Sequence, residues 1–111
     1  MKRIFKFKAW NTDTQLLMRL NQLDCDKGIL TKEHHILLQF TGRHDKNGSE
    51  IYERDLLLFG TDKWLVDWCE HDLRWKIYTN KKKTALPLNE KDLATGIRLC
   101  SYYESPESFT I

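Results

Sequence analysis

The chain has 111 residues, the size of one domain with a single core, and we expect residues 1–111 to fold as one unit. With 41% hydrophobic residues, 31% charged residues, two prolines and five glycines, the composition excludes a disordered or fibrous protein. The 18 basic residues nearly balance the 16 acidic ones, so the net charge of +2 gives no reason to require a polyanionic partner.

The N-terminal segment has the pattern of a half-buried strand. Between Arg3 and Trp10, the apolar residues Phe5, Phe7 and Ala9 alternate with other residues, mainly lysines, so one face of the strand would be apolar. The lysines also interrupt the apolar core that a signal peptide needs, and no run approaches membrane-spanning length. We therefore expect a cytoplasmic protein without a membrane partner.

The next segment fits two structures. Leu16, Leu20 and Leu23 recur at helical spacing behind polar capping residues, whereas Leu17 and Met18 also fit an extended run. Helix and strand both stay open here.

Four apolar runs after this segment predict strands, because each is short and rich in strand-forming residues. In chain order they are His34–Phe40, Leu56–Gly60, Lys63–Cys69 and Leu73–Tyr78. The sequence DKG at Asp26–Gly28 predicts a turn before the first run. Only Glu70–Asp72 separate the last two runs, which indicates a hairpin.

The C-terminal third is predicted to be a loop followed by a strand. Thr79–Thr84 is polar and is expected to be an exposed loop, and Asn89 is placed to cap a helical turn through Leu93. Ile97–Tyr103 then forms a last strand. These elements predict a mainly β (α+β) fold, a small, strongly bent sheet or partly open barrel with at most one short helix and a helical turn.

The stretch "QFTGRHDKNGSEIYERD" concentrates charged, aromatic and glycine residues. Asp45–Gly48 is a turn signal, and Thr41–Gly42 lets the preceding strand bend sharply, so the stretch has an architectural explanation. The alternative is a small hydrolase-type enzyme in which Glu53 and Asp55 form a carboxylate pair with His44 as proton shuttle. We favour the architectural interpretation and expect no catalytic residue and no cofactor.

The same stretch resembles the hallmark of the YopX family of small phage and prophage proteins, which reads approximately Q-Y-T-G-x-x-D-K-N-G-x-E-I-Y-E-G-D. The residues that fit this hallmark are Gln39, Phe40, Thr41, Gly42, Asp45, Lys46, Asn47, Gly48, Glu50, Ile51, Tyr52, Glu53 and Asp55. The segments "IFKFKAW" and "SYYESPE" are similar to the family's start and end, so the resemblance covers nearly the whole chain. It implies a mainly β domain with a barrel-like, SH3-like portion, encoded on a mobile element, and it implies no chemistry.

One position departs from the family pattern. Arg54 stands where the family usually has glycine between its glutamate and its aspartate. Arginine in a left-handed backbone conformation costs about 1 kcal/mol. Either the bend at this position is ordinary in geometry, or its shape differs in this chain.

The cysteines and histidines give only weak signals of a site. Cys25, Cys69 and Cys100 form no CxxC pair, so we expect three free thiols that behave as small buried hydrophobes in a reducing compartment. The sequence CEH that begins at Cys69, together with His34 and His35, lacks the spacing of metal ligands. We therefore expect solvated histidines and no metal.

The tryptophans are one candidate binding surface. Trp64 and Trp68 share a strand face, and Trp75 is placed to pair with them across the hairpin. We expect these side chains to fill the core. If one is exposed, it would be an anchor for a protein partner, because interfaces concentrate binding energy in aromatic residues.

A lysine run is the second candidate surface. Lys81, Lys82 and Lys83 lie in the predicted loop near Trp75 and Tyr78, and such a combination can bind nucleic acid through phosphate contacts and base stacking. A solvated loop is the alternative.

These observations lead to one functional expectation. The chain is expected to be a non-enzymatic accessory protein of a phage or mobile element that binds a host or phage protein. A nucleic-acid-binding module is the first alternative and an enzyme the second. Exposed strand edges would also favour a homo-oligomer.

Overall fold

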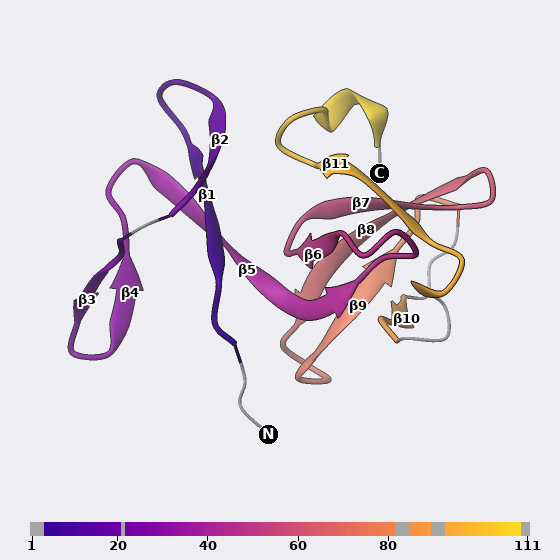
Figure 1. Ribbon diagram of the computed structural model, residues 1–111, viewed down its shortest axis with the longest axis horizontal. Coiled ribbons are helices and arrows are strands. Elements are labelled where there is room, and N and C mark those ends of the chain that lie inside the picture. The colour runs from indigo at the N-terminus through magenta and orange to yellow at the C-terminus, as the bar shows by residue number, and fades with distance from the viewer. Residues whose placement is uncertain (1–3, 21, 82–84, 90–92, 110–111) are drawn as a thin grey trace.

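The computed structural model describes residues 4–20, 22–81, 85–89 and 93–109, and this part of the chain consists of short strands joined by turns (Figure 1). The strands are β1 (Phe7–Asn11), β2 (Leu16–Arg19), β3 (Asp24–Asp26), β4 (Ile29–Thr31), β5 (His35–His44), β6 (Glu50–Tyr52), β7 (Asp55–Phe59), β8 (Asp62–Cys69), β9 (Arg74–Tyr78), β10 (Leu86–Pro87) and β11 (Ile97–Ser101). A single 3-10 turn, η1 (Pro106–Ser108), follows them in the described residues. The prediction of a mainly β fold is confirmed.

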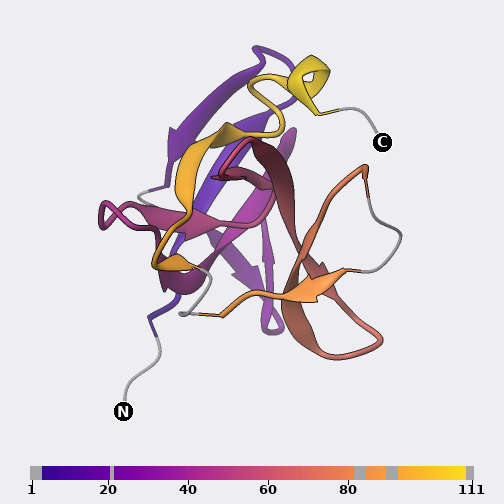
Figure 2. The same ribbon diagram turned by 90° about the vertical axis from the view of Figure 1, so that its right-hand side faces the viewer.

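The strands form two larger sheets and one small hairpin. One sheet has the order β2-β1-β5-β6, the other has the order β10-β9-β8-β7-β11, and β3 pairs only with β4. Strands β1 to β4 and the first half of β5 form a wing, whereas β6 to β11 curl around each other beside it (Figure 1). The long strand β5 runs from the wing into the curled part, which Figure 2 shows from the side.

The core lies in the curled part and has two sides. On β8, alternate side chains point to opposite faces, so Trp64 and Val66 contact one cluster of buried residues and Leu65 contacts another. The first cluster contains Ile51, Leu57, Trp64, Val66, Ile77, Leu88 and Leu93. The second contains Leu56, Leu65 and Phe109. Because the middle parts of β7 and β8 are covered on both faces, Leu56–Leu58 and Trp64–Val66 are unbroken apolar runs.

The segment after β1 is a strand, so the extended alternative is the one that the structure adopts. The Asn11 carboxamide oxygen accepts the amides of Asp13 at 2.9 Å and Thr14 at 3.0 Å, and Gln15 has a φ of 57°. The polar residues that could have capped a helix therefore form a hairpin turn.

Strand β5 is longer than predicted. It continues past Phe40 to His44, with an irregular register between these two residues and a φ of 85° at Gly42. The bend expected at Thr41–Gly42 is thus absorbed as an irregularity within a paired strand, which glycine permits because it lacks a Cβ. The predicted turn at 45–48 follows directly and connects β5 to β6.

Several expectations about single residues are wrong. Phe5 is 62% exposed because pairing in β1 begins only at Phe7, and Cys25 is exposed because it lies on the hairpin β3–β4 outside the core. Thr79, expected in an exposed loop, is buried. The predicted last strand ends at Ser101, where the chain turns.

The segment between β9 and β11 is described only in part. Lys82, Lys83 and Thr84 of the predicted loop, and positions 90–92 of the predicted helical turn, lie outside the described residues. The amide of Leu93 donates to the carbonyl of Asn89 at 3.2 Å, as in a helical turn. Strand β10 was not predicted, and it lies at a sheet edge, where Pro87 needs no amide hydrogen.

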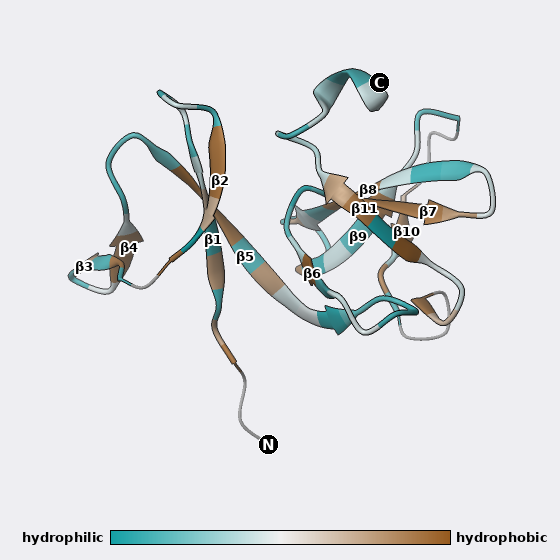
Figure 3. Cartoon of the chain, turned by 45° about the horizontal axis from the view of Figure 1, so that its top comes forward, coloured by the Kyte–Doolittle hydropathy of each residue, from teal (hydrophilic) through white to brown (hydrophobic). Residues whose placement is uncertain are grey.

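The wing carries much of the exposed apolar surface. Figure 3 shows hydrophobic stretches along β2 and β4. Five large apolar side chains of the wing strands are exposed. They are Leu16, Met18, Ile29, Leu30 and Ile36. No helix in the described ranges has the length and apolar composition to cross a membrane.

Candidate functional site

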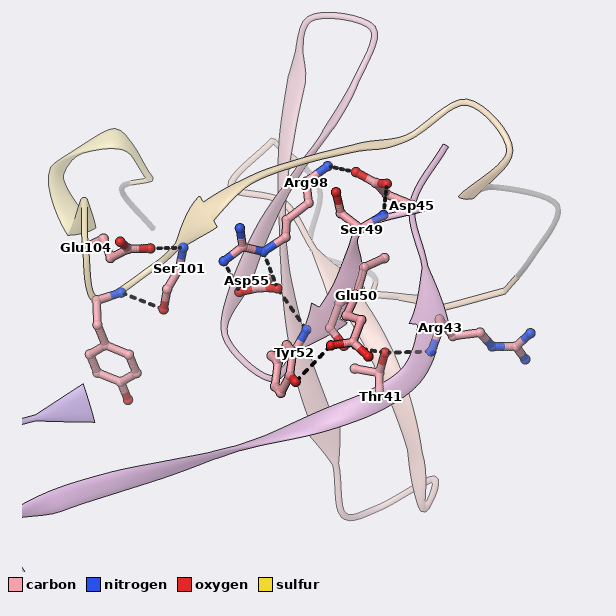
Figure 4. Close-up of polar contacts among 12 residues, drawn as sticks. Thr41, Arg43, Asp45, Ser49, Glu50, Tyr52, Asp55, Arg98, Ser101 and Glu104 are labelled. Carbon is pink, nitrogen blue, oxygen red and sulfur yellow. Dashed lines mark hydrogen bonds and ion pairs between the residues drawn. The ribbon is translucent and has the colours of Figure 1, made fainter. Parts of the chain in front are cut away.

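The turn between β5 and β6 is organised by a buried carboxylate. The amides of Asn47 and Ser49 donate to Oδ1 of Asp45 at 2.9 and 2.8 Å, and the amide of Arg98 donates to Oδ2 at 2.7 Å (Figure 4). Burial raises the pKa of Asp45, but these three backbone hydrogen bonds outweigh burial and hold that pKa below its ordinary value. The turn is thereby attached to β11.

A second buried carboxylate stabilises the bend between β6 and β7. Asp55 is 1% exposed, and its Oδ2 accepts the amide of Tyr52 and Nε of Arg98, both at 2.8 Å (Figure 4). Burial raises the pKa of Asp55, and the hydrogen bonds and the charge of Arg98 oppose this shift without cancelling it. Asp45 and Asp55 thus both bind β11 through Arg98.

The proposed carboxylate pair of an enzyme is not assembled. Strand β6 ends at Tyr52 and β7 begins at Asp55, so Glu53 and Asp55 do not share one strand face. The Glu53 carboxylate accepts a hydrogen bond from the amide of Gln39 at 3.4 Å, so its partner differs from those of Asp55. His44 is exposed and its ring packs in an edge-to-face arrangement with Phe40, and no hydrogen bond joins it to either carboxylate among the described residues.

Arg54 keeps the left-handed conformation that a glycine would favour. Its φ is 65°, its amide donates to the carbonyl of Val66 at 2.8 Å, and its own carbonyl accepts the amide of Tyr102 at 2.6 Å. The guanidinium lies 3.0 Å from Oδ2 of Asp67 and 4.8 Å from the ring centre of Tyr102. The bend is therefore not ordinary in geometry, and arginine has contacts there that glycine would lack.

The other motif residues contribute packing and turn geometry. The hydroxyl of Thr41 donates to the carbonyl of Ile51 at 2.7 Å, and Ile51 is fully buried. Tyr52 is also buried and donates its hydroxyl to Glu50 at 3.2 Å (Figure 4). Gly48 has a φ of 82°, as the turn requires.

The three tryptophans have different environments. Trp64 is 7% exposed and belongs to the core, as expected, and Trp75 packs partly buried against the same cluster. Trp68 lies directly opposite Trp75 in the register of β8 and β9 and is 39% exposed. Their ring centres are 5.2 Å apart at an interplanar angle of 73°. The expectation of core filling is therefore wrong for Trp68, because it lies near the end of β8, beyond the buried part of the strand.

These two tryptophans line a surface depression of about 410 Å³ together with Gln39 and Glu53, which we call the tryptophan hollow. Burial raises the pKa of Glu53 and the charge of Asp67 adds to this shift, whereas the amide of Gln39 and the charge of Arg54 oppose it. Sequence reasoning named Glu53 and both tryptophans in separate hypotheses and missed that they meet. Gln39 was noted only as a motif residue, because its contact with Glu53 depends on the path of β5 through both parts of the fold.

The predicted basic and aromatic surface is described only in part. Nζ of Lys81 lies 2.6 Å from Oδ1 of Asp62, so this lysine has an acidic partner, and Lys82 and Lys83 lie outside the described residues. Trp75 and Tyr78 are three residues apart on β9, so their side chains point to opposite faces of the sheet. In the described part of the chain, no group of three histidine, cysteine or acidic residues is arranged to hold a metal ion.

Comparisons with known proteins show the family and the fold. The family model described as "YopX protein" matches residues 4–109. A search of curated proteins finds no match. The solved "Crystal structure of protein EF1440 from Enterococcus faecalis" is similar, with a TM-score of 0.73 and 17% sequence identity, covering 98% of this chain and 100% of that chain. At this identity the likeness shows a common fold and carries no function.

Proposed function

The chain belongs to the YopX family, and from that premise we propose that it is a non-enzymatic accessory protein of a phage or other mobile element that binds a protein partner. The mobile-element setting rests on the family resemblance. The single observation that supports protein binding is the exposed indole of Trp68, held against Trp75 at one end of the curled sheet. A cytoplasmic location stays a prediction.

A tryptophan at the rim of a depression is a suitable anchor for a protein interface. Tryptophan is enriched among the residues that dominate binding energy, and its ring loses little conformational entropy when it is held in place. The wing adjoins the hollow, because Phe7 of β1 lies opposite Gln39 in the register of β1 and β5. A partner could therefore cover the hollow and part of the wing.

The contacts of Asp55, one member of the candidate carboxylate pair Glu53 and Asp55, give weaker support for a non-enzymatic role than the exposed Trp68 gives for protein binding. Asp55 is engaged by Arg98 and the Tyr52 amide, and we infer that the turn and bend of the motif serve the architecture of the fold.

Self-association through the exposed apolar side chains of the wing is a separate prediction that sedimentation equilibrium can check.

Capture experiments with three forms of the protein test the proposal. Wild type, Trp68→Ala and Leu99→Ala would each be immobilised and exposed to a host lysate, with thermal unfolding as a check of folding. Leu99 is a matched control, because it is 41% exposed and lies on β11, outside the residues that line the hollow. We expect one protein to be captured by wild type and Leu99→Ala but not by Trp68→Ala. Equal capture by all three would contradict binding through this site.

A further inference from the structure

We propose that the tryptophan hollow recognises a cationic side chain, a lysine or an arginine of the protein partner. This inference rests on the proposed function and names the chemistry of the ligand at the same site. Three features of the hollow support this inference: the shape of its aromatic walls, the carboxylate of Glu53 and the size of the depression.

The aromatic walls form a corner. The indoles of Trp68 and Trp75 meet at 73° with ring centres 5.2 Å apart, so one ring presents its edge to the face of the other, and both rings line the hollow. The face of an indole ring is electrically negative and attracts a cation within about 6 Å of its centre. Tryptophan is the best of the side chains for this interaction.

The negative charge at the hollow is that of Glu53. The amide of Gln39 donates to Oε1 of Glu53 over a long distance of 3.4 Å, and the second oxygen has no hydrogen bond to any described residue. The neighbouring Asp67 is already paired with Arg54 at 3.0 Å, so its charge is largely compensated. A cation entering the hollow would therefore pair with Glu53.

The desolvation of Glu53 supports the same conclusion. Burial raises the pKa of this carboxyl, and the Gln39 amide and the charge of Arg54 oppose the shift without cancelling it, so a further positive charge beside Glu53 would stabilise its ionised form. A neutral apolar side chain would fill the space between the indoles but would leave this carboxylate with only the long hydrogen bond from the Gln39 amide, and an anion would be repelled. A cation on an aliphatic stem satisfies both the rings and the carboxylate.

The depression also has a suitable size. A volume of about 410 Å³ lies in the range of ligand pockets and accommodates the aliphatic stem of one long side chain with its charged end. Both lysine and arginine fit this description, so the shared chemistry is a positive charge on a flexible apolar stem.

A titration followed by nuclear magnetic resonance tests the proposal with small probes. The probes are acetylated and amidated tripeptides with lysine, trimethyllysine, arginine or neutral norleucine between two glycines. We expect the three cationic peptides, but not the norleucine peptide, to shift the indole N–H signals of Trp68 and Trp75. The order of the three affinities would identify the preferred cation. Equal binding of the norleucine peptide would overturn the proposal.

Two charge-matched variants complete the test. Glu53→Gln keeps the shape of the side chain and removes its charge, whereas Glu70→Gln removes an exposed charge from the β8–β9 turn, outside the residues that line the hollow. We expect Glu53→Gln to weaken binding of the lysine peptide about tenfold and Glu70→Gln to leave it unchanged. An equal effect of the two variants would overturn cation recognition.

Capture of the partner distinguishes this inference from the proposed function. If Glu53→Gln captures the partner as well as wild type does, while Trp68→Ala does not, the hollow binds protein without selecting a cation, and only the present inference fails. If Trp68→Ala captures the partner fully, the proposed function fails, and the peptide titration then decides independently whether the hollow binds cations.

Discussion

Substitution of Arg54 by alanine and by glycine separates backbone strain from side-chain contacts at the bend between β6 and β7. Both variants lose the guanidinium contacts with Asp67 and Tyr102. Only the glycine variant also removes the strain of a non-glycine residue at a φ of 65°. The difference in stability between the two variants therefore measures the strain.

The expected magnitudes follow from the contacts. The Arg54–Asp67 pair is about one third exposed and contributes about 0.5–1 kcal/mol, and the contact with the Tyr102 ring adds a similar amount. Arg54→Ala should therefore destabilise the fold by about 1–2 kcal/mol. Arg54→Gly should be more stable than Arg54→Ala by about 1 kcal/mol, because glycine relieves the strain.

Urea unfolding of both variants gives the two free energies. Arg74 provides the control, since it is exposed on β9 and is not among the residues with positive φ. At that position the order should reverse, with glycine about 0.5–1 kcal/mol less stable than alanine, because glycine weakens a strand. If alanine at position 54 proved as stable as glycine there, the bend would not be strained.

Four further predictions concern the turn, the ion pair, a glycine and the nucleic-acid alternative. The pKa of Asp45 lies below the ordinary value, so its ionised form stabilises the fold above about pH 4 and this stability is lost as the pH falls through the folded-state pKa. Asp45→Asn should therefore cost about 1–3 kcal/mol near neutral pH and less at about pH 3 in urea unfolding, and an equal cost at both would contradict the hydrogen-bond argument. Asp55→Ala leaves a partly buried guanidinium unpaired and should cost about 3–5 kcal/mol, whereas additional removal of Arg98 should cost less than the sum of the single losses. Gly96→Ala places a Cβ 2.6 Å from the Phe59 ring and should lower stability by about 1–3 kcal/mol, so an unchanged melting temperature would show that the ring moves freely. Binding of the captured partner should depend on salt much less than the slope of roughly −2.7 expected for three phosphate contacts, and a slope that steep would favour the nucleic-acid alternative.

The turn and most strands of the curled part could be predicted from local pattern. Residues that tolerate positive φ or bond their own backbone predict the Asp45–Gly48 turn. Short apolar runs with turns between them predict β7, β8 and β9. These signals lie within a few residues of one another, so no knowledge of distant parts of the chain is needed.

The region after β1 could not be resolved in the same way, because its leucines fit helical and extended spacing equally well. The choice is made by Asn11, whose side chain closes a turn, and by pairing with β1, which provides backbone hydrogen bonds between strands in place of those within a helix. The formation of strand β10 likewise depends on β9, which offers it an edge for pairing.

The sequence by itself determined the mainly β class, the turn chemistry and the family, because each is carried by residues close together in the chain. Only the tertiary structure decided which residues meet at the surface. Glu53 comes to Trp68 and Trp75 because β5 crosses into the curled part and β8 pairs with β9 in one register. Such long-range pairing depends on how the apolar faces pack, and local residue patterns do not contain that information.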